Sequence, residues 1–271
     1  MRKIVLAASA AVALGLSGPA SGATINYVEE SIGVSGGTQG GLEADCADGE
    51  RALGGGILST GNYDTSDLNA SYPTDGPDSN ERSDDAWRAY IDAYDLVSIT
   101  VKVACVGGNP TKNLKYRDDV ARVPKGATKA LRVGCPRGYK VTSGGVSNSG
   151  VFEQAELKTS RPVDGNTSWE GAIRNLTSHR LKIFVSAVCA RGSFAKGLAY
   201  RQKTREADPD SQAAALSNCP VGGTAVGGGV RVKGALSNVN TNVINVSSSI
   251  SYVDATGGNP VEFTNYLICH G

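Results

Sequence analysis

The amino-acid sequence predicts an all-β protein made of three homologous antiparallel β-sandwich or barrel-like units of about 80–89 residues, each with one disulfide. Three observations predict this fold. The 271 residues include 35 Gly but only 4 Phe, 2 Trp and 1 Met, and such a composition is typical of strands and turns. Apolar and polar residues alternate in several segments, as in strands with one buried face. A pattern of Cys, Gly and Tyr occurs three times in register.

Residues 1–23 have the three parts of a secretory signal peptide. Arg2 and Lys3 form a positive start, Ile4 to Leu16 is an apolar stretch of 13 residues, and Ser21-Gly22-Ala23 offers a cleavage site. A membrane-spanning helix needs about 20 apolar residues, and no segment of the chain reaches that length. We therefore expect a secreted, extracellular mature chain that starts at Thr24 and does not insert into a membrane.

The repeated pattern is Tyr-x18-Cys-x2-Gly-x5-Gly-Gly-x4-Gly, and all three copies match it without a gap. Its Tyr and Cys positions are Tyr27 and Cys46, Tyr116 and Cys135, and Tyr200 and Cys219. Each copy ends in a second cysteine, namely Cys105, Cys189 or Cys269. We name the predicted units repeat 1 (24–108), repeat 2 (109–192) and repeat 3 (193–271). The sequence leaves open whether they are separate beads or one body with pseudo-three-fold symmetry.

The strands are predicted by alternation. Ile99, Val101 and Val103 alternate with polar or small residues before Cys105, and the segments before the other two closing cysteines do the same, with Asn265 as the exception. About six short strands per repeat follow, joined by turns rich in Gly, Asn, Asp and Pro.

Six cysteines in a secreted chain predict three disulfides. Sequence alone allows 15 pairings for six cysteines, but the repeat selects one bridge within each unit. The predicted pairs are Cys46–Cys105, Cys135–Cys189 and Cys219–Cys269. Each bridge would stabilise its unit by roughly 4 kcal/mol in the chain-entropy model. A redox role is disfavoured because no Cys-x-x-Cys occurs.

Aromatic residues are the candidate ligand contacts. Trp87, Trp169 and Tyr27 would stack on sugar rings or a protein partner if they were exposed. Trp87 and Trp169 share one repeat position inside an alternating strand, however, and the Tyr recurs in all three repeats. This recurrence favours packing in the core over ligand binding for each of them.

Two further motifs have a functional and a structural interpretation. The Gly-Gly pair would cradle a phosphate only if a helix followed; without a helix it indicates a bulge or a close approach of two strands. Acidic residues crowd a loop of repeat 1 and would suit calcium, but their spacing is not that of an EF-hand loop and Arg82 lies among them, so a solvated loop is favoured. They are Asp75, Asp78, Glu81, Asp84 and Asp85. We predict no metal and no cofactor.

Charge and composition disfavour several function classes. The chain has 27 basic and 26 acidic residues, so no net charge attracts it to nucleic acid. It has only 2 His and no paired-Cys metal spacing, which disfavours a zinc enzyme. His179 has no nucleophile motif near it. We therefore expect no catalytic residues and no enzyme activity.

Several motifs of the chain resemble those of a known module. They are the Cys-Pro-x-Gly starts at Cys135 and Cys219, the Gly-Gly pair, the Ser-x-Pro and Trp of repeats 1 and 2, and the Val-Cys-Ala at Cys189. The module is a cysteine-bridged β-module of secreted actinobacterial proteins, present here in three copies. Repeat 1 has Ala47 where the other two repeats have Pro after the first Cys, and repeat 3 lacks the Trp and the Ser-x-Pro. The Cys-Pro start and Cys end are also similar to the β-prism of vitelline membrane outer layer protein I. The resemblance implies a binding or assembly part and no catalytic set.

The expected function is a secreted, non-enzymatic binding or scaffold protein whose partner is an extracellular protein or a glycan. A subunit or adaptor of an extracellular assembly, such as a secreted toxin particle, fits this description. Two alternatives remain: a lectin with one shallow site per repeat, and a hydrolase with a site between repeats. Equivalent exposed aromatic and acidic residues in each repeat would favour the lectin, and one site at one seam would favour a protein partner or an enzyme.

Overall fold

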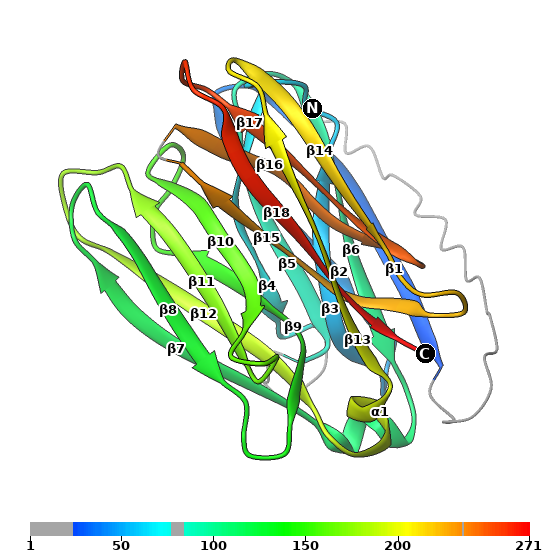
Figure 1. Ribbon diagram of the computed structural model, residues 1–271. Coiled ribbons are helices and arrows are strands. Elements are labelled where there is room, and N and C mark those ends of the chain that lie inside the picture. The colour runs from blue at the N-terminus through cyan, green and yellow to red at the C-terminus, as the bar shows by residue number, and fades with distance from the viewer. Residues whose placement is uncertain (1–23, 77–83, 235) are drawn as a thin grey trace, which may run out of the picture.

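The computed structural model describes residues 24–76, 84–234 and 236–271. The predicted all-β fold is confirmed: within these ranges, eighteen strands form three six-stranded antiparallel sheets (Figure 1). Each repeat supplies six strands, as its alternation predicts. The predicted signal peptide, residues 1–23, lies outside the described residues.

The strands fall at equivalent positions in the three repeats. Repeat 1 contains β1 (Ile25–Val34), β2 (Thr38–Asp45), β3 (Arg51–Ser59), β4 (Ser66–Thr74), β5 (Ala86–Ala93) and β6 (Val97–Val106). Repeat 2 contains β7 (Leu114–Val123), β8 (Thr128–Gly134), β9 (Lys140–Asn148), β10 (Ala155–Val163), β11 (Ser168–Asn175) and β12 (Leu181–Ala190). Repeat 3 contains β13 (Leu198–Ala207), β14 (Ser211–Asn218), β15 (Thr224–Lys233), β16 (Ser237–Asn245), β17 (Ser248–Ala255) and β18 (Val261–His270). Two short helical connectors, η1 (Asn109–Asn113) and α1 (Gly192–Lys196), link the repeats.

Each sheet is shared between two repeats. Sheet A has the order β1-β6-β3-β16-β17-β14, sheet B has β2-β5-β4-β9-β12-β7, and sheet C has β13-β18-β15-β10-β11-β8. Every repeat therefore gives its first, third and sixth strands to one sheet and its second, fourth and fifth to the next. This cyclic sharing relates the repeats by a pseudo-three-fold axis. The repeats form one body rather than separate beads (Figure 1).

The second glycine of each Gly-Gly pair lies at a seam where strands of two repeats meet. A Cβ atom on Gly56, Gly145 or Gly229 would lie 2.2–2.4 Å from the carbonyl oxygen of Asn242, Ser71 or Ser160 on the facing strand. Any side chain would force the two backbones apart, because real Cβ atoms essentially never approach so closely. The close strand approach that the motif predicts is present in all three repeats.

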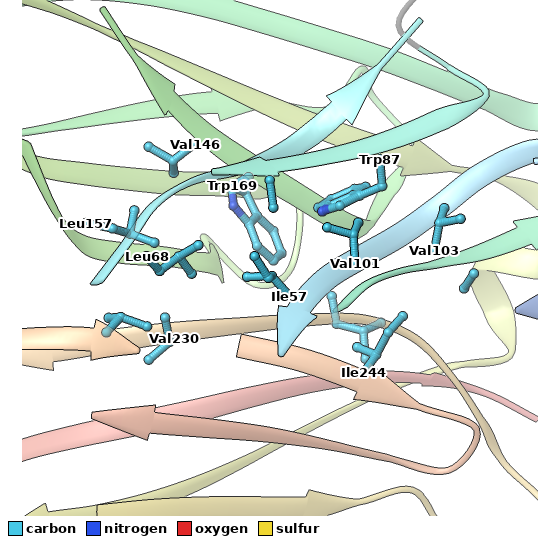
Figure 2. Close-up of a cluster of buried hydrophobic side chains, with 14 of the residues drawn as sticks. Ile57, Leu68, Trp87, Val101, Val103, Val146, Leu157, Trp169, Val230 and Ile244 are labelled. Carbon is cyan, nitrogen blue, oxygen red and sulfur yellow. The ribbon is translucent and has the colours of Figure 1, made fainter. Parts of the chain in front are cut away.

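The sheets enclose one core to which all three repeats contribute. Figure 2 shows Trp87 and Trp169 among aliphatic side chains such as Ile57, Leu157 and Ile244. The first glycine of the pair makes room for the indoles, since a Cβ on Gly55 or Gly144 would lie 2.4 Å from an indole Cγ.

Repeat 3 has no tryptophan, and a Cβ on Gly228, the counterpart of Gly55 and Gly144, would first meet Ile244 at 3.0 Å and then Ser249 at 3.5 Å. Its β17 carries Ser249 at the position of Trp87 and Trp169. The buried Asn265 amide donates to the hydroxyls of Ser249 and Ser217 at 2.9 and 3.0 Å, and its Oδ1 accepts from Ser251 at 2.7 Å. This network explains why Asn265 interrupts the apolar alternation of the last strand, since a buried polar group needs hydrogen-bond partners.

Two cyclic sets of hydrogen bonds join the repeats. At one end, the repeated tyrosines Tyr27, Tyr116 and Tyr200 donate to main-chain carbonyls of a neighbouring repeat, those of Ala225, Ala52 and Val141, at 2.5, 2.7 and 2.7 Å. Nearer the other end, the residue at the bulge of the fourth strand donates to the first carbonyl of the equivalent strand in the next repeat. These pairs are Asn69 to Ala155, Lys158 to Ser237 and Asn240 to Ser66.

The three predicted disulfides, Cys46–Cys105, Cys135–Cys189 and Cys219–Cys269, are present, one within each repeat. Bridges of this kind persist in oxidising compartments. In the described part of the chain, no helix combines the length and the apolar character that a membrane crossing requires.

Candidate functional site: a basic hollow on sheet C

The aromatic candidates all have structural roles. Trp87 and Trp169 are 1% and 0% exposed, and their Nε1 atoms donate to the hydroxyls of Ser71 and Ser160 at 2.8 and 3.0 Å. Tyr27 is partly buried and its hydroxyl joins two repeats. Both indoles are enclosed in the core, so neither ring has a face on which a ligand would stack.

The acidic loop of repeat 1 is only partly described, because Asp78 and Glu81 lie outside the described residues. Asp84 pairs with Arg51 at 3.1 Å, and Asp85 accepts a hydrogen bond from the amide of Gly76 at 2.5 Å. Arg51, Asp84 and Asp85 border a hollow of about 190 Å³ beside Cys46. Within the described ranges, no group of three or more His, Cys, Asp or Glu side chains could hold a metal ion.

A larger hollow of about 400 Å³ lies on the outer face of sheet C, across β8, β11, β10 and β15. We call it the basic hollow. It spans the seam between repeats 2 and 3, where β10 and β15 pair only at Thr159↔Arg231 and Ser160↔Val230. Its lining consists of Thr128, Ala130, Lys158, Thr159, Glu170, Ala172, Arg174, Arg231, Val232, Lys233 and Gly234.

The hollow is open because Ala172 is small. Ala172 is the fifth residue of β11, and the fifth residues of the equivalent strands β5 and β17 are Tyr90 and Tyr252. On sheet B the Tyr90 ring lies over Gly41 of the neighbouring strand, where a Cβ would meet the ring at 2.3 Å. The corresponding pair on sheet C is Ala130↔Ala172. Two small side chains therefore leave empty a space that an aromatic ring covers on sheet B.

The basic residues of the lining are specific to this seam. Each of the four stands where both other repeats have a neutral or acidic residue. Lys158 replaces Asn69 and Asn240, Arg174 replaces Asp92 and Asp254, Arg231 replaces Leu58 and Ser147, and Lys233 replaces Thr60 and Ser149. The seam that has the small Ala172 is thus also the seam that has the four basic residues.

Two of these cations are paired within repeat 2. The Lys158 Nζ lies 2.9 Å from the carboxylate of Glu156 and donates to the carbonyl of Ser237 at 2.5 Å, and Arg174 lies 3.6 Å from the same Glu156 carboxylate. Lys158 is only 5% exposed. Burial lowers the pKa of Lys158, while Glu156 acts in the opposite direction.

Glu170 is the acidic residue of the lining, and two arginines hold it. Arg132 and Arg161 approach its two carboxylate oxygens at 2.8 and 2.9 Å. Burial raises the pKa of Glu170, but the hydrogen bonds from Arg132 and Arg161 together outweigh it, so the pKa lies below the ordinary value. Glu170 is therefore an oriented carboxylate anion.

Arg231 differs from the other cations. Its guanidinium makes no ion pair or side-chain hydrogen bond with any residue that the structure describes, whereas Lys233 pairs with Glu262. Among the described residues, six basic side chains line the hollow or pair with its lining, and four acidic ones line it or pair with one of these six, which leaves a local excess of two positive charges. They are Arg132, Lys158, Arg161, Arg174, Arg231 and Lys233, against Glu156, Asp164, Glu170 and Glu262.

Sequence reasoning did not select these residues. A signal for part of the hollow was nevertheless present, because the alignment of repeats 1 and 3 places Tyr90 with Tyr252 and Asp92 with Asp254. Extending it to repeat 2 through Trp169 gives Ala172 and Arg174 at those positions. No such signal identified Arg231 as part of the hollow, because its position there depends on the pairing of β15 with β10 across the seam.

Comparison with protein-family models finds no match to the chain, and comparison with curated proteins finds no significant relative.

Proposed function

We propose that this chain is a secreted, non-enzymatic binding protein that holds an extracellular protein or glycan partner through the basic hollow. The observation that carries the proposal is that the hollow lies at a seam with four basic residues, none of which has a basic counterpart at the two equivalent seams. A site at a single seam supports one specialised ligand face. A role as a subunit or adaptor of an extracellular assembly, such as a secreted toxin particle, is compatible with one such face.

The difference between the repeats supports this proposal over a lectin with one site in each. At the positions of Arg174, the other repeats have Asp92 and Asp254, which are buried. They accept hydrogen bonds from the amides of Glu153 and Asp64 at 3.0 and 3.1 Å. Both carboxylates therefore anchor a loop of the neighbouring repeat instead of facing a ligand.

The state of Glu170 supports binding over hydrolysis between repeats. A general acid needs a pKa raised toward the working pH, whereas two arginines lower the pKa of Glu170. Secretion is supported by the signal peptide that the sequence predicts over residues 1–23 and by the three disulfides.

The test is to fill the hollow. Ala172→Tyr introduces the residue that repeats 1 and 3 carry at this position, so β11 should accept it. The matched control is Ala214→Tyr, which adds the same ring to the exposed Ala214 of β14 on sheet A.

Wild-type protein and both variants are immobilised and exposed to culture medium and cell-surface extract of the producing organism, and the retained material is analysed by mass spectrometry and sugar analysis. We expect a component that wild type and Ala214→Tyr retain and Ala172→Tyr loses. Equal retention by all three proteins would contradict a binding role for the hollow.

A further inference from the structure

The geometry points to an anionic polysaccharide as the ligand of the basic hollow, with an acidic group of the polymer paired to Arg231. This inference rests on the proposed function, because it assumes that the hollow is the binding site. It goes further by naming the chemical class of the ligand and the side chain that recognises it.

An anionic ligand is favoured because acidic side chains of the protein do not fully neutralise the positive charge of the hollow. Glu156 and Glu170 pair with cations of repeat 2, and Glu262 pairs with Lys233, but the cations outnumber these acids. Arg231 lies beside Thr159 at the seam without such a partner among the described residues. A guanidinium presents planar donors that match a carboxylate or sulfate.

A sugar polymer is favoured over a peptide because the hollow lies on the face of a sheet. The strand β11, which carries Ala172 in the floor of the hollow, is paired on both sides, with β10 and with β8. Its main-chain groups are therefore not offered to an added strand, which requires a free sheet edge. Recognition must come from side chains. Thr128, Thr159 and Lys233 supply polar groups for sugar hydroxyls.

The floor of the hollow also fits a chain of charged sugars. Ala130, Ala172 and Val232 give it small apolar surfaces, which suit the C–H faces of a sugar ring. The volume of about 400 Å³ is in the lower part of the range for small-ligand sites, about 300–1,000 Å³. The lining has no aromatic ring, so charge rather than ring stacking must supply the specificity.

The experiment is calorimetric titration of the full secreted protein with four polymers at physiological ionic strength. Polygalacturonate carries carboxylates, dextran sulfate carries sulfates, pullulan is neutral, and poly-glutamate is an acidic peptide. The variants are Ala172→Tyr, Arg231→Ser, which installs the residue found at this position in repeat 2, and the control Arg122→Ser on the exposed strand β7 of sheet B. Thermal unfolding confirms that each variant is folded.

We expect wild type to bind polygalacturonate, dextran sulfate or both, and not pullulan. Arg231→Ser and Ala172→Tyr should each weaken binding about tenfold or more, since a hydrogen bond to a charged group is worth that factor. Arg122→Ser should bind as wild type does. Which polymer binds more tightly distinguishes a carboxylate ligand from a sulfate ligand.

Three results would overturn the inference. They are binding to neither anionic polysaccharide, equal losses in Arg122→Ser and Arg231→Ser, and poly-glutamate binding as tight as that of the sugars. The retention experiment with Ala172→Tyr separates the two failures. If a protein is retained through the hollow while no polysaccharide binds, the ligand class is wrong and the proposed binding role stands.

Discussion

Asp67 is a buried acid on β4 whose environment disfavours its charged form. The Tyr94 hydroxyl donates to its Oδ2 at 2.8 Å, and its Oδ1 has no hydrogen-bond partner among the described residues. Burial, together with the nearby charges of Asp254, Glu156 and Asp92, raises the pKa of Asp67 to about 8 despite the hydrogen bond from Tyr94. The equivalent residue of repeat 3 is Asn238, so this position accepts an amide.

These values define a pH dependence of stability. The folded protein keeps the Asp67 proton up to about pH 8, whereas the unfolded chain loses it near the ordinary pKa of 3.8. The unfolded state therefore binds fewer protons between these values, and the contribution of Asp67 to the free energy of unfolding falls as the pH rises through this window.

Asp67→Asn should remove this contribution, because the amide does not ionise. The variant should be more stable than wild type above about pH 8, by on the order of 1–3 kcal/mol, the cost of a buried unsatisfied polar group. Urea unfolding at about pH 5 and about pH 9 measures the difference, with Asp118→Asn on the exposed strand β7 as the control. A difference between wild type and Asp67→Asn that stays constant with pH would refute the account.

At the scale of the strands, the seams depend on glycine. Gly229 of β15 faces Ser160 of β10, and a Cβ on Gly229 would lie 2.4 Å from the Ser160 carbonyl oxygen. That oxygen belongs to the backbone, so a methyl group can be accommodated only if the two strands separate. The basic hollow lies at this same seam and should change with it.

We expect Gly229→Ala to lower the free energy of unfolding by about 1–3 kcal/mol, the usual cost of an overpacked site. Gly33→Ala is the matched control, because a Cβ on Gly33 of β1 would meet nothing within 4 Å. Its unfolding midpoint should stay within error of wild type or rise slightly. Urea titration followed by circular dichroism measures both, and equal effects of the two substitutions would show that the seam does not require glycine.

The strands were predictable and their partners were not. Alternation before Cys105 and the register of Tyr27, Cys46 and the Gly-Gly pair define the elements of repeat 1 through short-range pattern alone. The pairing of β3 with β16, at Asn242↔Ile57, joins residues that are far apart in the sequence. No local pattern specifies such a contact, so the sharing of sheets, and with it the hollow, could not be read from the sequence.

For the whole molecule, the shared sheets predict one cooperative unfolding transition. The disulfides lie within repeats, but every sheet and both cyclic sets of hydrogen bonds extend across repeats. Loss of one repeat leaves two sheets with three strands each. No repeat therefore retains a complete sheet alone.

Scanning calorimetry of the oxidised protein should show a single transition with equal calorimetric and van't Hoff enthalpies. A chain cut back to repeats 1 and 2 should fail to unfold cooperatively, because β3 of sheet A and β10 of sheet C lose their partners β16 and β15. Two or three separable transitions in the full protein would indicate that the repeats are independent after all.

The cyclic pairing of the repeats has a consequence for how a lone binding site can arise. Each repeat gives three strands to a sheet shared with one of the other repeats and three strands to a sheet shared with the other. Three copies of one ancestral chain could therefore form the same closed body as a symmetric trimer. In such a trimer a mutation that opened one seam would open all three. Tandem duplication within one gene removes that coupling, because Ala172 and Arg231 can change while Tyr90, Tyr252 and Ser147 stay as they are. A fused chain can therefore evolve one seam for a ligand while the other two continue to hold the body together.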